Sequence, residues 1–537
     1  MTKKILMLSI FLVVVVVFVY LIDMSSSNRA QKELLDDSTE IFINGSERYQ
    51  VIDGFGASGA WSMDPIGSEW SEPNKNKIAD LLFSREKGIG LSVWRFNIGA
   101  GSDKTDQLII KNPWRSVESF KENEEAEYDW SKQAGQQWFL NAAKERGVEN
   151  FVAFVNSPPV WMTKNGHAQP DSQVGTTNLK PEYVDDFAIF LADVLEHFKN
   201  KGIDFKYVSP INEPTWDWNL AGQEGNRYSI EDIKAVVHAL YQEIQARNLN
   251  TEIDVIEGVE YLAMLDDEKY AEFVGTESNY TSGVSDGRYG GKYREYIKEL
   301  LGDSEIKEKI GNKISSHAYW SDQMEDSAGN DRLIRLRELL HDNINQYSSD
   351  AKFWMTEYCV LGADGHGRDL GMDTALRVAR IIHYDLTKAN ASSWQWWTAV
   401  SKEDYKDGLI YTDYLSHGNE ESIIESKLLW SFGNYSRFIR PGAYRVQLNG
   451  ADNKLGLMGS AYIDEERKQL TTVFVNHGEE EELINFSFDS LPKGKEIQKL
   501  VPYVTSEEND LVEGDAISAS DVYSVPAKSV VTFVGEF

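Results

Sequence analysis

Short apolar segments recur along residues 54–398, and stretches with helical periodicity separate them. Apolar residues of 184–198 return every three or four positions, as on one face of a helix, and those of 233–244 do the same. Alternating strands and helices favour a parallel sheet, and eight such strands are typical of a closed α/β barrel. We therefore predict a (β/α)8 TIM barrel. Its expected strand segments are 54–61, 91–99, 151–157, 207–212, 253–257, 314–317, 353–357 and 393–398.

The apolar pattern changes after about Trp430. It becomes alternating, as in residues 470–476, and Gly, Pro and Asn stand at the breaks. This pattern predicts a C-terminal antiparallel β-sandwich side domain. Ile41–Asn44 is also strand-like, and we expect it to complete this side domain rather than the barrel. The predicted division is 1–30 signal peptide or membrane anchor, 38–50 strand of the β domain, 51–430 barrel and 431–537 β domain.

The N-terminal residues indicate a targeting segment rather than a part of the folded domains. Lys3 and Lys4 precede an apolar run over residues 5–22, which indicates an export signal or an uncleaved anchor. Either interpretation predicts an extracellular or cell-surface protein. Cys359 is the single cysteine, so no disulfide can form within the chain and the core alone must stabilise it.

The formal charge of −32 bears on the partners of this chain. Such a charge repels phosphate backbones and anionic polysaccharides, which argues for a neutral ligand and against nucleic acid. Solubility in a salty habitat is an alternative reason for it. The nine histidines show no metal-binding spacing, and no glycine-rich phosphate loop follows a strand, so we expect no metal and no cofactor. Membrane anchoring through residues 5–22 stays open, and we expect a monomer.

Two apolar segments end on a glutamate. Glu213 lies between Asn212 and Pro214, and Glu357 ends the string Trp354–Glu357. The interval between them suits three βα units, which places them on the fourth and seventh barrel strands. Side chains at the C-terminal strand ends face the mouth of such a barrel. A protonated and an ionised carboxyl about 5 Å apart are the machinery of retaining glycoside hydrolysis. We assign Glu213 as acid/base and Glu357 as nucleophile, with simple ion pairing at strand ends as the alternative.

The chain resembles glycoside hydrolase family 30 over nearly all of residues 38–537. The strings that carry the resemblance are VIDGFGASGAW (51–61), LSVWRFNIGAGS (91–102), NSPPVWM (156–162), SPINEPTWDW (209–218), SSHAYW (315–320), WMTEYC (354–359) and YSRFIRPGAYRV (435–446). Within the family, the run before residue 102 and the WDW after Glu213 look like the endo-β-1,6-galactanase branch.

Other strand-end residues are candidates for contact with the reacting groups or the sugar. Arg95 is expected to keep Glu357 ionised and oriented, unless it only forms a rim salt bridge. Asn212 suits a hydrogen bond to the sugar 2-hydroxyl, and a turn-capping role is the alternative. Tyr319 is expected to hydrogen-bond Glu357, whereas His317 is either part of the site or a core histidine.

Aromatic residues are the expected walls of the sugar site, because flat sugar faces stack on such rings. Of the fifteen tryptophans, the strand-end candidates are Trp61, Trp161, Trp216, Trp218, Trp320, Trp394, Trp396 and Trp397. Strand alternation separates Trp396 from Trp397, and the resemblance favours Trp397 as the floor of the cleavage subsite. Asp53, with Gly54, is predicted to contact outer hydroxyls of the same sugar. Cys359 shares the strand face of Glu357 by parity, and we interpret it as packing.

We therefore expect a retaining glycosidase acting on β-linked neutral polysaccharide, with β-1,6-linked galactan as the leading substrate. The alternatives within hydrolases are a β-1,6-glucanase, a xylanase, or an exo-acting β-galactosidase or β-fucosidase. An alternative from another class is a surface carbohydrate-binding protein without turnover. Transglycosylation would use the same residues as hydrolysis. The β domain is expected to brace the barrel.

Overall fold

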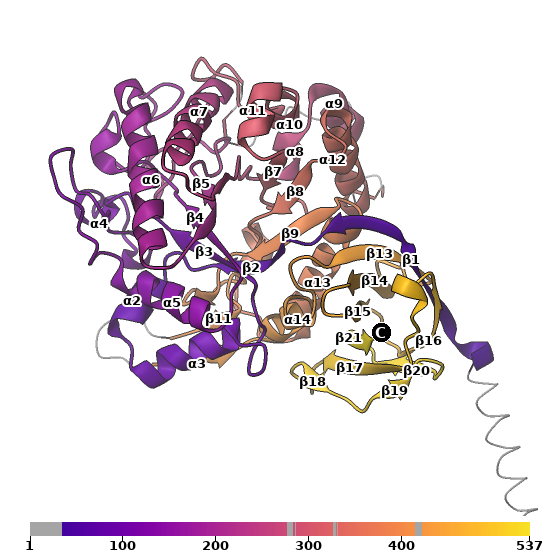
Figure 1. Cartoon of the computed structure of the whole chain (residues 1–537). Helices are drawn as coiled ribbons and strands as arrows, with labels where there is room; N and C mark the ends of the chain where they lie inside the picture. Colours follow the sequence, from indigo (N-terminus) through magenta and orange to yellow (C-terminus); the bar gives the residue numbers. More distant parts are fainter. Residues whose placement is uncertain (1–34, 276–282, 285, 326–328, 330, 414–420) are drawn as a thin grey trace, which may run out of the picture.

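The computed structural model describes residues 35–537 except 276–282, 285, 326–328, 330 and 414–420. The apolar run 5–22, predicted to be an export signal or anchor, lies outside the described residues. None of the described helices has the length and apolarity needed to span a membrane. Figure 1 shows a barrel built by the middle of the chain beside a smaller β domain that carries the C-terminus.

Eight parallel strands form the barrel, in the order β6-β5-β4-β3-β2-β9-β8-β7. The ring closes between its end strands, where Gly258 pairs with Ser316 and the N–H of Ser315 donates to the carbonyl of Val255 at 2.8 Å. Each strand overlaps a predicted segment, so the barrel prediction is confirmed. The strands are β2 (Gly54–Ser58), β3 (Val93–Asn97), β4 (Asn150–Phe154), β5 (Phe205–Ser209), β6 (Glu252–Ile253), β7 (Lys313–Ser316), β8 (Lys352–Met355) and β9 (Ala391–Trp396).

Helices connect successive strands and surround the barrel (Figure 1). The longer helices bury an apolar face, and in α6 this face includes Phe187, Leu191 and Phe198, as its periodicity predicts. A capping box is present at the start of α7, where Ser229 and Asp232 exchange hydrogen bonds. The helices are α2 (Met63–Glu69), α3 (Glu72–Phe83), α4 (Ser102–Thr105), α5 (Ala134–Glu145), α6 (Val184–Asn200), α7 (Ile230–Ala246), α8 (Tyr261–Met264), α9 (Asp267–Val274), α10 (Tyr296–Leu301), α11 (Ser304–Lys309), α12 (Leu333–Tyr347), α13 (Met372–Thr387) and α14 (Lys427–Ser436).

The barrel interior is packed with side chains rather than open. Val93, Val152, Tyr207 and Trp354 form one buried cluster inside it. Lys313 lies over the rings of Tyr207 and Trp354, at 4.2 and 3.8 Å from their centroids. These packed side chains close the barrel below its C-terminal strand ends, so a ligand that enters from the mouth meets described residues that lie at or beyond those ends.

The β domain contains strands from both ends of the chain. β1 (Thr39–Val51) runs antiparallel to β13 (Tyr444–Asn449) and parallel to β16 (Glu482–Asp489), as predicted for Ile41–Asn44. The ring of Phe486 on β16 lies 5.1 Å from that of Phe533 on β21 (Ser529–Glu536), although four strands separate them in the sheet. The ten-stranded sheet therefore curls over itself into a sandwich. Its other strands are β14 (Leu457–Asp464), β15 (Gln469–Asn476), β17 (Lys499–Thr505), β18 (Val512–Glu513), β19 (Ile517–Ser518) and β20 (Tyr523–Val525).

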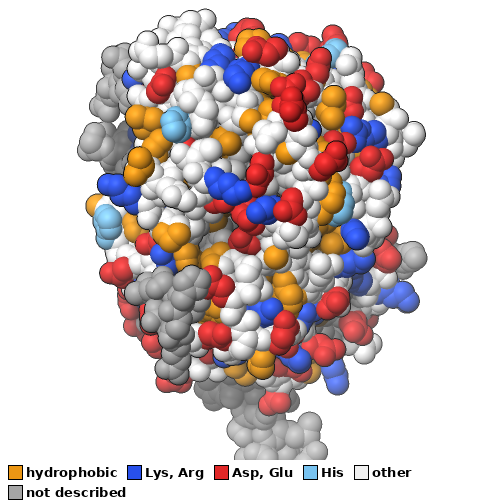
Figure 2. Space-filling model, turned by 90° about the vertical axis from the view of Figure 1, so that its left-hand side faces the viewer, with side chains coloured by type: hydrophobic (Ala, Val, Ile, Leu, Met, Phe, Trp, Pro, Cys, Tyr) orange, Lys and Arg blue, Asp and Glu red, His pale blue; other side chains and the backbone are white. Residues whose placement is uncertain are grey.

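The change from barrel to β domain lies further along the chain than the pattern at Trp430 suggested. Residue 430 is inside α14, which begins after its cap at Ser426, and the first strand of the β domain begins at Tyr444. Short strands β10 (Val400–Ser401), β11 (Ile410–Tyr411) and β12 (Ile424–Glu425) form a small sheet after β9. On the face shown in Figure 2, acidic and basic side chains are interspersed, so the net charge does not gather there as one patch.

Candidate active site

Glu213 stands on a turn beyond β5, the fourth barrel strand. The strand ends at Ser209, so its hydrogen-bonded pairing stops ahead of Pro214, and the proline is not what ends it. Glu213 itself has φ of 44°, in the left-handed region, which is costly for a residue with a side chain. Three hydrogen bonds hold this conformation: its N–H donates to the carbonyl of Glu257 at 2.9 Å, and its carbonyl accepts from the Trp216 N–H at 3.0 Å and from the Trp218 indole at 3.1 Å. The carboxyl is thereby directed into the barrel mouth.

Glu357 follows β8, the seventh barrel strand, and is held by donors on both carboxylate oxygens. Arg95 of β3 donates from Nη1 to Oε1 at 2.6 Å, and the Tyr319 hydroxyl donates to Oε2 at 3.1 Å. Burial raises the pKa of Glu357, while the charges of His317 and Arg95 act against this rise. Because every close partner is a donor, the arrangement suits the ionised carboxylate.

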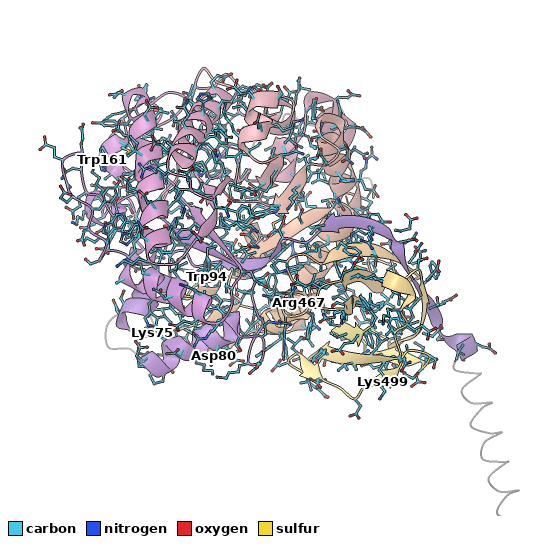
Figure 3. All side chains as sticks on the ribbon, in the orientation of Figure 1. Lys75, Asp80, Trp94, Trp161, Arg467 and Lys499 are labelled. Atoms are coloured by element: carbon cyan, nitrogen blue, oxygen red, sulfur yellow. The ribbon has the colours of Figure 1, made fainter. Side chains whose placement is uncertain are left out.

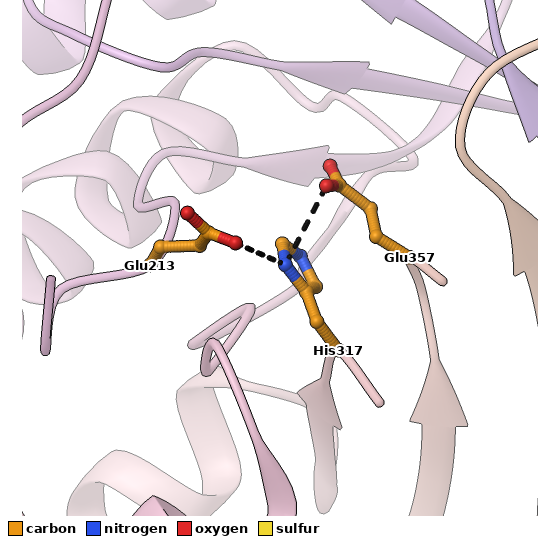
Figure 4. Close-up of side chains that lie close together, drawn as sticks. All are labelled: Glu213, His317 and Glu357. Atoms are coloured by element: carbon orange, nitrogen blue, oxygen red, sulfur yellow. Dashed lines mark hydrogen bonds and ion pairs between the residues drawn. The ribbon is translucent and has the colours of Figure 1, made fainter. Parts of the chain in front are cut away.

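His317, just after β7, lies between the two glutamates (Figure 4). Its Nδ1 is 3.0 Å from Oε1 of Glu213 and 3.5 Å from Oε2 of Glu357. Ligand atoms of the three side chains all lie within 4.8 Å of one another, so one oxygen of Glu213 is within that distance of one oxygen of Glu357. Two carboxyls this close, with a cation between them, are arranged to act on one bond.

Glu257 is a third glutamate of this site, and the sequence interpretation gave it no role. It is fully buried beyond β6, where its Oε2 lies 2.9 Å from Nε2 of His317 and 3.1 Å from Nη2 of Arg95. Burial alone would raise the pKa of Glu257, but the charges of Arg95 and His317 prevail and lower it to about 2. Glu257 thus carries the negative charge that balances two buried cations.

The protonation state of His317 follows from its partners. Both ring nitrogens are within hydrogen-bond distance of a carboxylate oxygen, so the ring donates from both nitrogens when these carboxyls are ionised. Burial lowers the pKa of His317, but the charge of Glu357 and the hydrogen bonds to Glu213 and Glu257 outweigh it and raise the pKa to about 10. The resulting imidazolium has no lone pair for a metal, although Glu213, His317 and Glu357 are close enough to hold one.

A cavity of about 180 Å³ opens above these groups. Tyr319, Trp397 and both catalytic candidates line it, and Trp216 and Trp320 stack at 5.9 Å on its wall near Glu213. Cys359 also lines it, and burial, with the nearby charges of Asp407 and Glu357, raises the pKa of its thiol, which stays protonated. The lining residues are Arg115, Asn156, Asn212, Glu213, Trp216, Gln223, Val259, Tyr319, Trp320, Glu357, Cys359, Leu361, Trp397, Tyr405 and Asp407.

Comparison with known proteins agrees with this geometry. The family model described as O-Glycosyl hydrolase family 30 matches residues 38–411. The chain belongs to O-glycosyl hydrolase family 30. The family 30 hydrolase is 24% identical over 399 residues to an endo-beta-1,6-galactanase of Hypocrea rufa, and the match covers 70% of each protein.

Solved structures resemble it over most of its length. A conserved exported protein from Bacteroides fragilis has a TM-score of 0.77 and 32% identity, covering 92% of this chain and 99% of that one. The catalytic domain of a GH30 xylanase C from Talaromyces cellulolyticus has a TM-score of 0.66 and 20% identity, covering 93% and 100%. The family 30 hydrolase is therefore an O-glycosyl hydrolase with a barrel and a separate β domain.

Three residues predicted to bind substrate lie elsewhere. Asp53 precedes β2 at the opposite end of the barrel, where it accepts from Lys352 at 2.7 Å and from the Trp354 indole at 2.9 Å. Trp394 is fully buried, and its indole donates to Asp385 at 2.8 Å. Trp161 lies at the outer edge of the barrel (Figure 3), where its indole donates to the carbonyl of Lys121. The predictions for Asp53, Gly54 and Trp394 were therefore wrong, whereas Trp161 lies outside the cavity that holds the two glutamates.

The remaining tryptophan candidates divide between the cavity and the core. Trp397 faces the cavity, and Trp61 packs edge-on against it with ring centroids 5.3 Å apart. Trp396 and Trp218 are buried and donate to backbone carbonyls of the site loops. Parity along β9 separates Trp396 from Trp397 as expected, but it also places Trp394 on the buried face.

Beside the predicted Asn212, the cavity gathers polar residues from other loops that sequence reasoning missed, among them Asn156, Arg115 and Asp407. Asn156 Nδ2, Asn212 Oδ1 and Asp407 Oδ1 are buried without a hydrogen-bond partner in the described part of the chain. Such atoms are costly unless a ligand or water satisfies them. Asn156 begins the string NSPPVWM just beyond β4, and that position was the available signal. Arg115 and Asp407 lie in long loops, where strand parity gives no indication.

Proposed function

We propose that this family 30 enzyme hydrolyses β-linked neutral polysaccharide with retention of configuration, using Glu357 as nucleophile and Glu213 as acid/base. The observation that carries the proposal is that one carboxylate oxygen of Glu213 lies within 4.8 Å of one carboxylate oxygen of Glu357. Retaining enzymes place the two carboxyls about 5 Å apart, whereas inverting enzymes leave about 6.5–9.5 Å for a water. The space here suits direct attack by one carboxylate.

In the first step, protonated Glu213 gives its proton to the glycosidic oxygen while an oxygen of Glu357 attacks the anomeric carbon. The bond to the leaving sugar breaks and a glycosyl ester forms on Glu357. Arg95 and Tyr319 orient Glu357 for this attack through their hydrogen bonds at 2.6 and 3.1 Å. Asn212 lies in the cavity with its free Oδ1, where it suits the 2-hydroxyl of the reacting sugar.

In the second step, ionised Glu213 takes a proton from water, whose oxygen attacks the same carbon and releases Glu357. His317 links the two steps, because its Nδ1 faces both carboxyls. Once Glu357 is esterified it no longer carries charge, so the imidazolium then stabilises the negative charge of Glu213.

For the substrate, we infer an endo-β-1,6-galactanase acting on galactan side chains of arabinogalactan. Three observations support this: the similarity to the Hypocrea rufa galactanase, the stacked Trp216 and Trp320 beside Glu213, and the absence of a net basic charge that anionic chains would require. We also infer export to the cell surface or medium, from the apolar run 5–22, which fractionation of expressing cells would test.

Product analysis on β-1,6-galactan, β-1,6-glucan and xylan tests the proposal. We expect short β-1,6-galacto-oligosaccharides from the first substrate, with the β-anomer appearing first in a proton NMR time course. Glu357→Gln should abolish activity, and Glu213→Gln should lower it roughly 10²–10⁴-fold on the polysaccharide. Glu145→Gln, at an exposed position at the end of α5, is the matched control. An α-anomer first, or activity in Glu357→Gln, would contradict the mechanism. Cleavage of another substrate alone would contradict only the galactanase assignment.

A further inference from the structure

The catalytic cavity continues past Trp397. Arg115, Trp397 and Asp407 line both this cavity and a second, shallower groove. The groove runs over the loops that follow β2, β3 and β9, and Trp61 and Trp114 form part of its floor. Its polar lining includes Asn112, Lys402 and Glu403. The three shared residues are thus a junction, which we call the Asp407 junction.

The direction of the groove follows from the roles of the two glutamates. Glu213 protonates the leaving sugar, so the leaving side of the substrate lies toward Glu213, Trp216 and Trp320, none of which lines the second groove. Glu357 attacks the sugar that remains, which lies toward Trp397. The groove beyond Trp397 therefore extends the glycone side, the part of the chain that stays bound to Glu357.

The backbone of Asp407 is fixed where it meets the junction. Its carbonyl accepts hydrogen bonds from the Thr398 N–H and from the Trp396 indole at 2.9 Å. The side chain is only 7% exposed, and Oδ1 has no partner among the described residues. Burial raises the pKa of Asp407 to about 6, in spite of a hydrogen bond from Ser401 and the charge of Arg115. A carboxyl so poorly satisfied is prepared for an external donor.

Arg115 supplies the complementary donors. Its Nη1 donates to Oε1 of Gln223 at 2.9 Å, which ties the loop after β3 to the loop after β5 and fixes the guanidinium at the cavity wall. Beside it, Asn112 Nδ2 donates to Oε1 of Glu403 at 2.9 Å. The junction therefore presents a fixed acceptor and a fixed donor near the ring of Trp397, and its two charges have opposite sign. Neutral sugar hydroxyls, which both donate and accept, match this pair.

We infer that Asp407 and Arg115 are specificity-determining residues that bind sugar hydroxyls at the junction, and that the groove takes the next sugar unit on the glycone side. The enzyme then recognises at least two sugar units ahead of the scissile bond. This inference rests on the proposed function, since the direction of the groove depends on the roles of Glu213 and Glu357.

Chain-length kinetics test the inference. The wild type is compared with Asp407→Asn on an aryl β-galactoside, which offers one glycone unit, and on β-1,6-galactotriose and β-1,6-galactotetraose. We expect kcat/KM of the wild type to rise with chain length. Asp407→Asn should lower kcat/KM on the tetraose roughly ten- to one-hundredfold, which is the loss typical for a charged hydrogen-bonding partner. It should change kcat/KM on the aryl galactoside at most a few-fold. Arg115→Gln should show the same selectivity.

Controls separate this role from a structural one. Asp373→Asn, at an exposed position in the first turn of α13, should leave all three substrates unchanged. Equal losses by Asp407→Asn on every substrate, or a wild type indifferent to chain length, would overturn the second glycone subsite. If another β-linked glycan is cleaved instead of galactan, only the galactanase proposal fails, and the same comparison is made with its oligosaccharides. No cleavage of any glycan, with no binding to Glu357→Gln by calorimetry, would overturn both.

Discussion

At the scale of single residues, the site is a line of buried charges of alternating sign. Glu213, His317, Glu257, Arg95 and Glu357 follow one another through contacts of 3.0, 2.9, 3.1 and 2.6 Å. Buried ions are tolerated when each is paired, and loss of one member leaves its partner uncompensated. Glu257 is the central anion of this line, although it does not face the cavity.

Glu257→Gln tests whether the line sets the charge of His317. The wild-type pKa of His317 is raised to about 10, so its cation is present at neutral pH and lost only as the pH rises through that value. Removing Glu257 removes one of the groups that raise it. We therefore expect the alkaline limb of the kcat/KM profile to move to lower pH, together with a loss of about 3–5 kcal/mol in the free energy of unfolding.

The pH profile separates the two effects. Urea unfolding gives the stability of Glu257→Gln, and kinetics between pH 5 and about pH 10 give the limb. His317→Gln is the comparison, because its profile should lack a histidine-dependent limb altogether. If Glu257→Gln is destabilised but keeps the alkaline limb of the wild type, Glu257 holds the fold without setting the charge of His317.

The site residues that stand at the ends of apolar segments could be predicted from the sequence in part. Glu213 and Glu357 lie together because each follows the C-terminal end of its apolar strand. The C-terminal ends of parallel strands meet at the mouth of the barrel. The prediction for Asp53 was wrong because Asp53 precedes its strand, which places it at the N-terminal end of the barrel strands. The prediction for Trp394 was wrong because β9 is buried on both faces. Its sequence therefore does not show which alternate residues face the cavity.

At the scale of elements, the loops after the strands are held to one another by buried polar contacts. Glu224, in the loop between β5 and α7, is fully buried and accepts from the Ser102 hydroxyl at 2.6 Å and from the Ala100 N–H at 3.2 Å. Its neighbour Gln223 binds Arg115 at the junction. Glu224 therefore fixes the loop that carries one wall of the cavity to the loop after β3.

This contact makes stability depend on pH. Burial raises the pKa of Glu224 from 4.5 to about 8, against the hydrogen bonds that lower it. The folded state thus favours protonated Glu224, so its contribution is complete below about pH 4.5 and is lost as the pH rises through 8. Glu224→Gln stays neutral at all these pH values. We therefore expect its free energy of unfolding to rise relative to that of the wild type by about 1.4 kcal/mol per pH unit across this window.

Urea unfolding at pH 5 and pH 8.5 measures that difference. Glu231→Gln, at an exposed position in the first turn of α7, serves as control and should give the same difference at both values. A Glu224→Gln effect that does not change with pH would mean that Glu224 is already ionised in the folded protein. The role of Glu224 could not be predicted from the sequence, because long loops have no periodic pattern from which burial can be inferred.

At the scale of the whole molecule, the two ends of the chain meet in the β domain, and the barrel is attached to it. β1 lies between β13 and β16 in the sheet, with Ile41 and Ile43 fully buried. Asn434 of α14 donates to the carbonyl of Tyr503 on β17 at 3.0 Å, and its carbonyl accepts from Thr532 on β21. This architecture was predictable because helical and alternating periods differ. The position of the boundary was not, since α14 is apolar on a face that either domain can cover.

Removal of β1 tests whether the sandwich depends on this strand. Without it β16 and β20 lose their link to the remaining strands, and the apolar faces of Ile41 and Ile43 no longer cover the domain core. We expect a chain beginning at residue 52 to unfold at a temperature at least several degrees below that of a chain beginning at residue 35, because each lost isoleucine contributes about 2–5 kcal/mol. Calorimetry measures both midpoints. A synthetic peptide of residues 38–51 should restore the higher midpoint, whereas a peptide with Ile41 and Ile43 both changed to Asp should not. An unchanged midpoint in the shorter chain would show that the sheet closes without β1, and that the strand is an accessory to the barrel enzyme.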